Sequence, residues 1–137
     1  MLVVHLPGGV LMEYTDLLGT KFAVHGRGKD EGFDCYGLAI EVLRRNGIVL
    51  PDVWYADFGD RLAVENELVA KVEKIEEREV NCLVEIEVHG LPVHMAVYIG
   101  NGYIIHALYR VGVIIEPLRK YKNRIRGYYR VRNNQHI

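Results

Sequence analysis

Residues 93–108 read Val-His-Met-Ala-Val-Tyr-Ile-Gly-Asn-Gly-Tyr-Ile-Ile-His-Ala-Leu, and the class of fold follows from this segment. Two apolar runs flank Gly100-Asn101-Gly102, a pattern typical of a β-hairpin. Residues 80–88 alternate apolar and polar side chains like a half-buried strand, and residues 111–116 and 125–131 read as further strands. This half of the chain therefore predicts an antiparallel sheet of about five strands.

The first half of the chain carries a helical pattern instead. Glycines and charges over 26–32 mark a loop, and Asp34 is placed to cap a helix over residues 35–45 that stops at Asn46-Gly47. Residues 60–72 predict a second helix, with Asp60 as its cap. Helices followed by an antiparallel sheet define the α+β class, with the helices packed on the sheet.

The composition bounds the possible functions. A chain of 137 residues predicts one domain spanning 1–137. Seventeen Lys and Arg against eighteen Asp and Glu give a formal charge of -1, so no overall field recruits a polyanion. The N-terminus has no basic leader and no stretch approaches the ~18 apolar residues of a membrane span. We expect cytoplasmic synthesis without a signal peptide, no membrane span, and two reduced cysteines.

Charge is nevertheless polarised along the chain. Residues 65–87 contain eight glutamates, whereas residues 119–132 contain seven Lys and Arg with interleaved tyrosines. Such a basic run can indicate nucleic-acid binding, but Arg126, Arg130 and Arg132 share one strand parity, which favours a solvated sheet face and no nucleic acid. A contact with an anionic wall polymer or with a neighbouring subunit stays open, as does a groove-covering or partner-binding role for residues 54–79.

Cys35 is a candidate nucleophile because it occupies the first turn of the predicted helix. The unpaired amides and the helix dipole stabilise a thiolate there, although the adjacent charge of Asp34 opposes this. A nucleophilic cysteine also needs an imidazole, and the hairpin contains His94 and His106. Cys82 shares the parity of the apolar residues around it and is expected to pack in the core.

The two histidines can cooperate only if the hairpin turn has a particular length. A two-residue loop, Asn101-Gly102, would place His106 opposite Val97 and direct His94 to the other face. A three-residue loop, Gly100 to Gly102, would place His94 and His106 on one face as diagonal neighbours about 7 Å apart. The functional interpretation therefore requires the three-residue loop.

Several motifs resemble those of NlpC-type cell-wall cysteine peptidases. They are Gly-Phe-Asp-Cys-Tyr-Gly-Leu (32–38), Gly-Ile-Val-Leu-Pro (47–51), His-Met-Ala-Val-Tyr-Ile-Gly-Asn-Gly (94–102) and Ile-Ile-His-Ala (104–107). The resemblance covers residues 19 to 132 and implies a papain-like fold and hydrolysis of peptidoglycan stem peptides, typically between D-glutamate and a diamino acid. It implies that Cys35 is the nucleophile, His94 the general base and His106 the group that orients His94, with no metal or cofactor.

The resemblance also implies which residues surround the nucleophile. Phe22 stands near the position of a tyrosine that helps stabilise the oxyanion in the family, so His25 or Tyr14 is expected to substitute for the missing hydroxyl. Tyr36 replaces the serine that commonly follows the cysteine. Phe22, His25, Asp34 and Tyr36 are accordingly the expected oxyanion and substrate-binding residues.

His25-Gly26-Arg27, the absent leader and the ending Gly-Tyr-Tyr-Arg (127–130) resemble the branch of this family found in bacteriophage tails. That branch implies other phage tail proteins as partners and a site of action in the cell wall. An alternative is a structural or tail-assembly protein that keeps the fold with weak or lost catalysis. Zinc held by Cys35, His94 and His106 is a further alternative, but no paired-ligand motif supports it.

Overall fold

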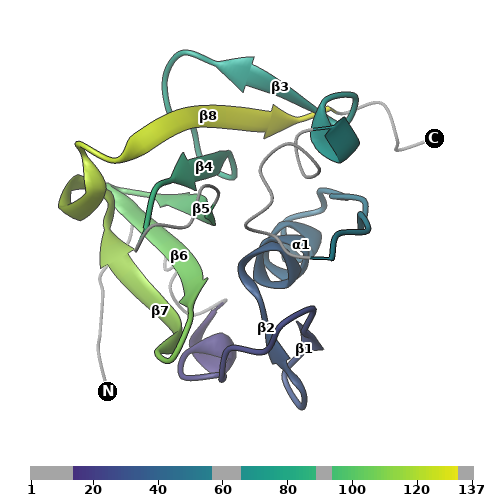
Figure 1. Ribbon diagram of the computed structural model, residues 1–137. Coiled ribbons are helices and arrows are strands. Elements are labelled where there is room, and N and C mark those ends of the chain that lie inside the picture. Colours follow the sequence, from purple (N-terminus) through teal and green to yellow (C-terminus); the bar gives the residue numbers. More distant parts are fainter. Residues whose placement is uncertain (1–13, 57–65, 89–93, 133–137) are drawn as a thin grey trace.

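The computed structural model describes residues 14–56, 66–88 and 94–132 (Figure 1). In chain order the elements are η2 (Thr15–Leu17), β1 (Arg27–Gly28), β2 (Gly32–Phe33), α1 (Cys35–Arg45), β3 (Val72–Ile75), β4 (Leu83–Ile86), β5 (Met95–Gly100), β6 (Tyr103–Leu108), β7 (Gly112–Pro117), η3 (Leu118–Tyr121) and β8 (Ile125–Val131). The order confirms an α+β fold in which helical structure precedes most of the sheet.

One antiparallel sheet of six strands, in the order β3-β8-β4-β5-β6-β7, forms the body of the molecule. Helix α1 packs against it next to β5 and β6, and the small β1-β2 sheet lies beside the helix (Figure 1).

The sixth strand is β3, which includes Val72, where the sequence predicts the end of a second helix. Only a helical turn at 66–68 remains of that helix within the described residues, and its expected cap, Asp60, lies outside them.

Helix α1 forms where the sequence predicts it, for the expected reasons. The Asp34 carboxylate accepts a hydrogen bond from the Gly37 amide at 2.7 Å, which satisfies one of the unpaired donors of the first turn. Its buried stripe faces the sheet, and the helix ends at Arg45, with Asn46 as its C-cap, followed by Gly47 with a φ of 77°. The residues of that stripe are Leu38, Ala39, Val42 and Leu43.

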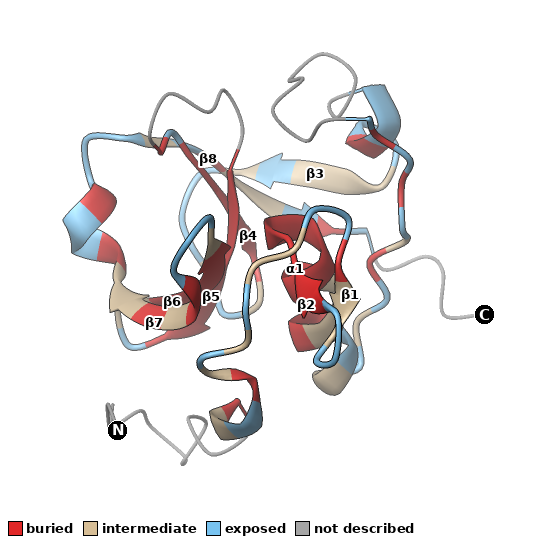
Figure 2. Ribbon diagram, turned by 60° about the horizontal axis from the view of Figure 1, so that its bottom comes forward, coloured by how far each residue is buried: buried red, intermediate tan, exposed pale blue. Residues whose placement is uncertain are grey.

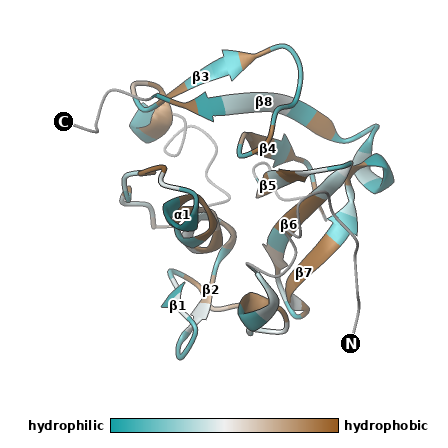
Figure 3. Ribbon diagram, turned by 180° about the vertical axis from the view of Figure 1, so that it is seen from behind, coloured by the Kyte–Doolittle hydropathy of each residue, from teal (hydrophilic) through white to brown (hydrophobic). Residues whose placement is uncertain are grey.

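The centre of the sheet, at β4 and β5, is buried on both faces, so the interpretation of residues 80–88 as a half-buried strand is wrong. All four residues of β4 are buried: Leu83 packs in the core under α1, whereas Val84 and Ile86 pack in a second core on the opposite face. Leu118 and Tyr121 of η3 belong to this second core. Figure 2 shows the resulting buried strands, and Figure 3 shows how brown, apolar segments recur along β4 to β7.

The turn of the β5-β6 hairpin differs from the one that the functional interpretation requires. Gly100 pairs with Tyr103, so the loop is the two residues Asn101-Gly102, with φ values of 54° and 86°. Two positive φ angles are typical of a type I′ turn. The expectation of a three-residue loop is therefore wrong. An irregularity between Tyr98 and Gly100, at Ile99, adds one residue to β5 just before the turn.

This bulge restores the side-chain parity that the three-residue loop would have produced. Val97 pairs with Ile105, so the continuing register sets Ala96 opposite His106. His94 lies two residues before Ala96 and therefore shares the face of His106. The prediction that His94 and His106 lie on one face of the sheet is therefore confirmed, but the bulge at Ile99 produces this arrangement instead of a three-residue loop.

The acidic segment 65–87 and the basic segment 119–132 form ion pairs with each other. Arg130 on β8 lies opposite Glu73 on β3 and bonds to Glu73 at 3.2 Å and to Glu79 at 2.7 Å, while Arg126 bonds to Glu87 at 2.9 Å. All of these side chains are at least two fifths exposed. The expected solvated face is confirmed, and its charges are compensated internally. Across the part of the chain described here, no helix has the length and apolar character needed to cross a membrane.

Candidate active site

Cys35 opens α1 and lies under the first residue of β5. The backbone amide of Met95 hydrogen-bonds to the sulfur, and only 6% of Cys35 is exposed. Burial raises the pKa of the thiol to about 12, and the charge of Asp34 acts in the same direction. The amides of Met95, Tyr36 and Cys35 itself oppose this rise. The helix start therefore holds a resting thiol, and a thiolate needs a base to form.

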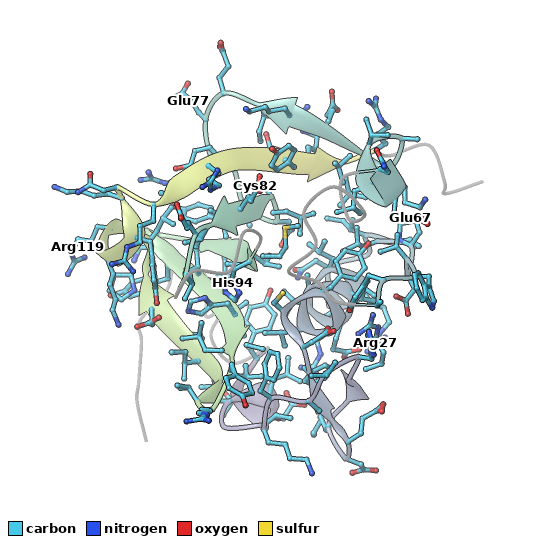
Figure 4. All side chains as sticks on the ribbon, in the orientation of Figure 1. Arg27, Glu67, Glu77, Cys82, His94 and Arg119 are labelled. Carbon is cyan, nitrogen blue, oxygen red and sulfur yellow. The ribbon has the colours of Figure 1, made fainter. Side chains whose placement is uncertain are left out.

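The expected pair of histidines is present. His94 Nε2 and His106 Nδ1 are 2.9 Å apart, and the two rings are inclined at 59°. His94 directly precedes Met95, so its Cα lies about 3.8 Å from the Cα of the residue whose amide contacts the sulfur. Both histidines are buried, and Figure 4 shows His94 in the interior of the molecule. Cys82, also labelled there, directly precedes β4 and belongs to the second core.

A third group lies behind the two histidines, and the sequence analysis missed it. His106 Nε2 is 2.8 Å from Glu116 Oε1. The Tyr121 hydroxyl donates to the same oxygen at 2.6 Å, and Lys120 bonds to the other oxygen. The hydrogen bond from His106 is the largest of the effects that lower the pKa of Glu116 to about 2. Strand parity would have revealed Glu116 only if the register of β6 against β7 had been known.

Asp34 is a structural acceptor rather than a substrate-binding group. It is 3% exposed and, besides the Gly37 amide, it accepts from the His25 amide at 3.1 Å and from Arg27 Nη1 at 2.9 Å. The Tyr55 hydroxyl also donates to it. Asp34 thereby ties the preceding loop to the start of α1, and its charge is compensated by Arg27.

The other expected oxyanion and substrate-binding residues are spread around the helix. Tyr36 has no exposed surface and its hydroxyl donates to the Pro51 carbonyl, so its side chain packs in the core. A role of Tyr36 at the oxyanion through its backbone amide stays a prediction. Tyr14 bonds through its hydroxyl to Asn46 at the far end of α1, about 16 Å from the first turn for eleven residues. Tyr14 therefore cannot replace the missing oxyanion donor.

Phe22 and His25 lie nearer to the start of the helix. Phe22 bridges to Phe33 in β2, and its ring packs edge-on against Tyr109 with 5.7 Å between centroids. His25 has a φ of 59°, and its Nε2 lies 2.8 Å from the Tyr55 carbonyl oxygen. His25 lines a surface depression of about 440 Å³ with Arg27, Asp52, Val53, Trp54 and Tyr55. Its role in substrate binding stays a prediction.

The arrangement of donors does not favour zinc. Two ring nitrogens of His94 and His106 bond to each other, and a third faces Glu116. No group of three His, Cys, Asp or Glu side chains within the described ranges is placed to hold a metal ion. The described residues thus contain a hydrogen-bonded row of His94, His106 and Glu116, together with a buried thiol whose sulfur contacts the amide of the residue after His94.

A helix that begins at a cysteine and packs on an antiparallel sheet, with one histidine directly before β5 and a second on β6, defines a papain-like α+β domain. The sequence profile of the NlpC/P60 family matches residues 19–130. The chain therefore belongs to the NlpC/P60 family, whose members are cysteine peptidases and peptidoglycan hydrolases. No curated protein sequence matches the chain.

Solved structures with the same fold include a lipoprotein-like NLP/P60 protein from Staphylococcus aureus, with 23% identity and a TM-score of 0.63 over 91% of this chain and 41% of that one. An NlpC/P60 protein from Bacillus cereus has 23% identity and a TM-score of 0.64 over 93% of this chain and 41% of that one. The chain thus spans about two fifths of those two proteins. The NlpC/p60 domain of the peptidoglycan hydrolase SagA has 20% identity and a TM-score of 0.60 over 89% of this chain and 96% of that domain.

Proposed function

We propose that this protein is a cysteine peptidase that hydrolyses amide bonds of peptidoglycan stem peptides, of the D-glutamyl-diamino acid type. The observation that carries the proposal is the convergence at the start of β5, where the Met95 amide contacts the Cys35 sulfur and the preceding residue, His94, bonds to His106. Family membership and the likeness to a peptidoglycan hydrolase domain support the choice of substrate.

In the proposed reaction His94 removes the proton of Cys35, and the sulfur attacks the carbonyl carbon of the scissile amide. The tetrahedral intermediate collapses as the C–N bond breaks, and His94 returns the proton to the leaving amine. Water then hydrolyses the thioester and releases the acyl group as a carboxylate. His106 holds the imidazole of His94 in position through both steps.

The oxyanion has backbone donors but no tyrosine hydroxyl from the family position. The amides of Cys35 and Tyr36 lie close enough to the sulfur to lower its pKa, so they create positive potential where the oxyanion forms. Phe22 supplies no hydrogen bond, and the loss of one oxyanion donor costs roughly 10²–10³ in rate. We therefore expect a slow enzyme compared with relatives that retain the tyrosine.

Digestion of purified peptidoglycan tests the proposal. Wild-type protein is compared with Cys35→Ala, and soluble stem peptides are identified by mass spectrometry. Cys82→Ala is the matched control, because it also removes a buried thiol but lies in the second core. The proposal expects fragments with new D-glutamyl ends from wild type and Cys82→Ala and none from Cys35→Ala. Equal release from Cys35→Ala and wild type would contradict the proposed nucleophile.

The second candidate function is a structural or tail-assembly role with weak or lost catalysis. Two observations favour it: burial raises the pKa of the Cys35 thiol to about 12, and Phe22 lacks the hydroxyl of the family tyrosine. The resemblance of residues 25–27 and 127–130 to phage tail proteins supports such a setting, with other tail proteins as partners and the virion tail as location. Digestion assays without fragments, together with loss of tail assembly when the protein is depleted, would favour this role over the peptidase.

A further inference from the structure

The carboxylate of Glu116 lies at the end of a hydrogen-bonded row of three side chains. His94 Nε2 is 2.9 Å from His106 Nδ1, and His106 Nε2 is 2.8 Å from Glu116 Oε1. The register explains the contact, since His106 pairs with Ile114 and Glu116 stands two residues further along the same face of β7. The row therefore takes His106 and Glu116 from the adjacent strands β6 and β7, and His94 from the position directly before β5, where its carbonyl accepts from the Ile86 amide at 2.8 Å.

The carboxylate of Glu116 determines which ring nitrogens of His106 and His94 carry protons. A carboxylate only accepts hydrogen bonds, so Nε2 of His106 must carry a proton. Nδ1 of a neutral His106 is then an acceptor, and Nε2 of His94 must donate to it. In a neutral His94, Nδ1 is consequently the ring nitrogen that carries no proton. One acceptor at the far end fixes the tautomers of both rings.

Glu116 is well equipped to remain ionised. Lys120 and Tyr121, both from η3, donate to its two oxygens, and the Tyr121 ring packs edge-on against His106 at 5.6 Å. These donors and His106 hold the pKa of Glu116 at about 2 despite burial, which acts in the opposite direction. His106 has no exposed surface, so water does not compete for its nitrogens.

We propose that Glu116 is a positioning residue that fixes His106 and His94 as their Nε2–H tautomers and so leaves Nδ1 of His94 to take the proton of Cys35. The catalytic meaning of that step rests on the proposed function, whereas the tautomers do not. When the S–H bond breaks, the new N–H bond forms at Nδ1 of His94, and the resulting imidazolium still donates through Nε2. No proton moves to Glu116, whose charge stabilises the imidazolium through His106.

Nitrogen-15 NMR of the histidine rings tests the tautomers directly in the full chain at neutral pH. The wild-type protein is expected to show Nε2–H signals for His94 and His106. Glu116→Gln, which replaces a pure acceptor with a group that also donates, is expected to shift both rings towards mixed tautomers. Glu87→Gln is the matched control, because Glu87 bonds to the exposed Arg126 on the sheet surface. It should leave both rings unchanged.

Hydrolysis by the same variants supplies a second readout. Glu116→Gln should lower kcat roughly 10- to 100-fold with little change in KM, and move the acidic limb of the pH–rate profile to lower pH, because the imidazolium loses its carboxylate. Glu116→Asp should restore part of kcat. A purely structural role would not move the acidic limb.

The outcomes separate this inference from the proposed function. A proton on Nδ1 of His106 in the wild type, or unchanged ring signals in folded Glu116→Gln, would overturn the role of Glu116 even if the protein hydrolyses peptidoglycan. The expected tautomers in a protein that cleaves no peptidoglycan would support the role of Glu116 and refute the peptidase. The wild-type spectrum alone keeps the inference falsifiable if Glu116→Gln does not fold.

Discussion

Asp34 holds the start of α1 through a set of hydrogen bonds that no other residue type can accept in full. Its carboxylate receives two backbone amides, a guanidinium and a phenol while it is almost entirely buried. An asparagine at this position retains one oxygen that can cap the helix, but an NH2 group replaces the other oxygen. This NH2 group is a donor and would face the donors that now bond to the carboxylate. The geometry of Cys35 therefore depends on a neighbour that does not itself contact the reacting atoms.

Asp34→Asn is accordingly expected to lower the free energy of unfolding by about 2–4 kcal/mol, because it breaks a buried ion pair and leaves donors unsatisfied. The matched control is Asp52→Asn, since Asp52 pairs with the same Arg27 but has a side chain that is 58% exposed. Its cost should be below about 1 kcal/mol. Urea denaturation of both variants measures the difference, and equal costs would contradict the role assigned to Asp34.

The ionised state of Glu116 predicts a pH dependence of stability. Chiefly through His106, the pKa of Glu116 falls from 4.5 to about 2 on folding, so Glu116 favours the folded state fully above pH 4.5. That contribution is lost as the pH falls from 4.5 towards 2. The difference in unfolding free energy between wild type and Glu116→Gln should therefore shrink over this interval. A difference that does not change down to pH 2.5 would show that Glu116 gains no stabilisation from its partners.

Among single residues, the sequence identifies the proposed catalytic groups better than the groups that support them. Cys35, His94 and His106 can be singled out because each residue type has a chemistry that the motif makes specific. Glu116 and Arg27 could not be singled out, because their contacts with His106 and Asp34 depend on which strand or loop lies beside them. The sequence also contains no sign that the side chain of Tyr36, next to the proposed nucleophile, is buried in the core.

Among the elements, α1 shows how a glycine allows close packing at the site. A Cβ added to Gly37 would lie 2.0 Å from the Gly26 carbonyl oxygen, which is backbone and cannot move aside. This approach lets the loop before Asp34 close over the first turn of the helix. Gly37 thus has a packing function at a position where helix propensity alone would favour alanine.

Gly37→Ala should therefore destabilise the protein by about 2–3 kcal/mol, although alanine is the better helix former by about 1 kcal/mol. Gly47→Ala is the control at the other end of α1, where an added Cβ meets nothing within 4 Å but φ is 77°. It should cost about 1 kcal/mol from backbone strain alone. Thermal unfolding checks both values, and a stabilised Gly37→Ala would mean that the loop does not lie where the structure has it.

The β5-β6 hairpin shows the limit of predicting register from sequence. The strand segments and the shared face of the two histidines were predicted, because apolar alternation marks strands and chemistry requires the shared face. The length of the turn and the bulge at Ile99 were not predicted. Gly100-Asn101-Gly102 is compatible with either turn length, and the sequence around Ile99 contains no pattern that indicates a bulge. Likewise, residues 72–75 carry apolar spacing that suits a helix, and only pairing with β8 makes them a strand.

For the whole molecule, the notable feature is one sheet that separates two cores. Leu83 lies in the core under α1 and Ile86 in the core covered by η3, and both are fully buried. Because the two side chains project from the same short strand, loss of packing on either face weakens the same sheet. The domain should therefore unfold as one unit.

Leu83→Ala and Ile86→Ala should each lower the unfolding free energy by about 2–5 kcal/mol through lost burial and a residual cavity. Both should preserve a single transition, with the same midpoint by far-ultraviolet and near-ultraviolet circular dichroism. Separate transitions in either variant would indicate that the two cores unfold independently, and the site on β5 and β6 would then be less rigid than described.

Cys35 and His94 are proposed to form one acid–base unit, and site-resolved alkylation tests this proposal most directly. Chiefly because burial raises its pKa, the thiol of Cys35 is almost entirely protonated at pH 7. Rapid reaction of Cys35 therefore requires a base beside it, whereas Cys82, whose pKa is also raised by burial, serves as the internal reference.

Iodoacetamide labelling at pH 7, followed by mass spectrometry of the two cysteine peptides, gives both rates in one sample. We predict that Cys35 in the wild type reacts at least about a hundredfold faster than Cys82, and that His94→Ala brings its rate down to that of Cys82. Equal rates for Cys35 in the wild type and in folded His94→Ala would contradict the account.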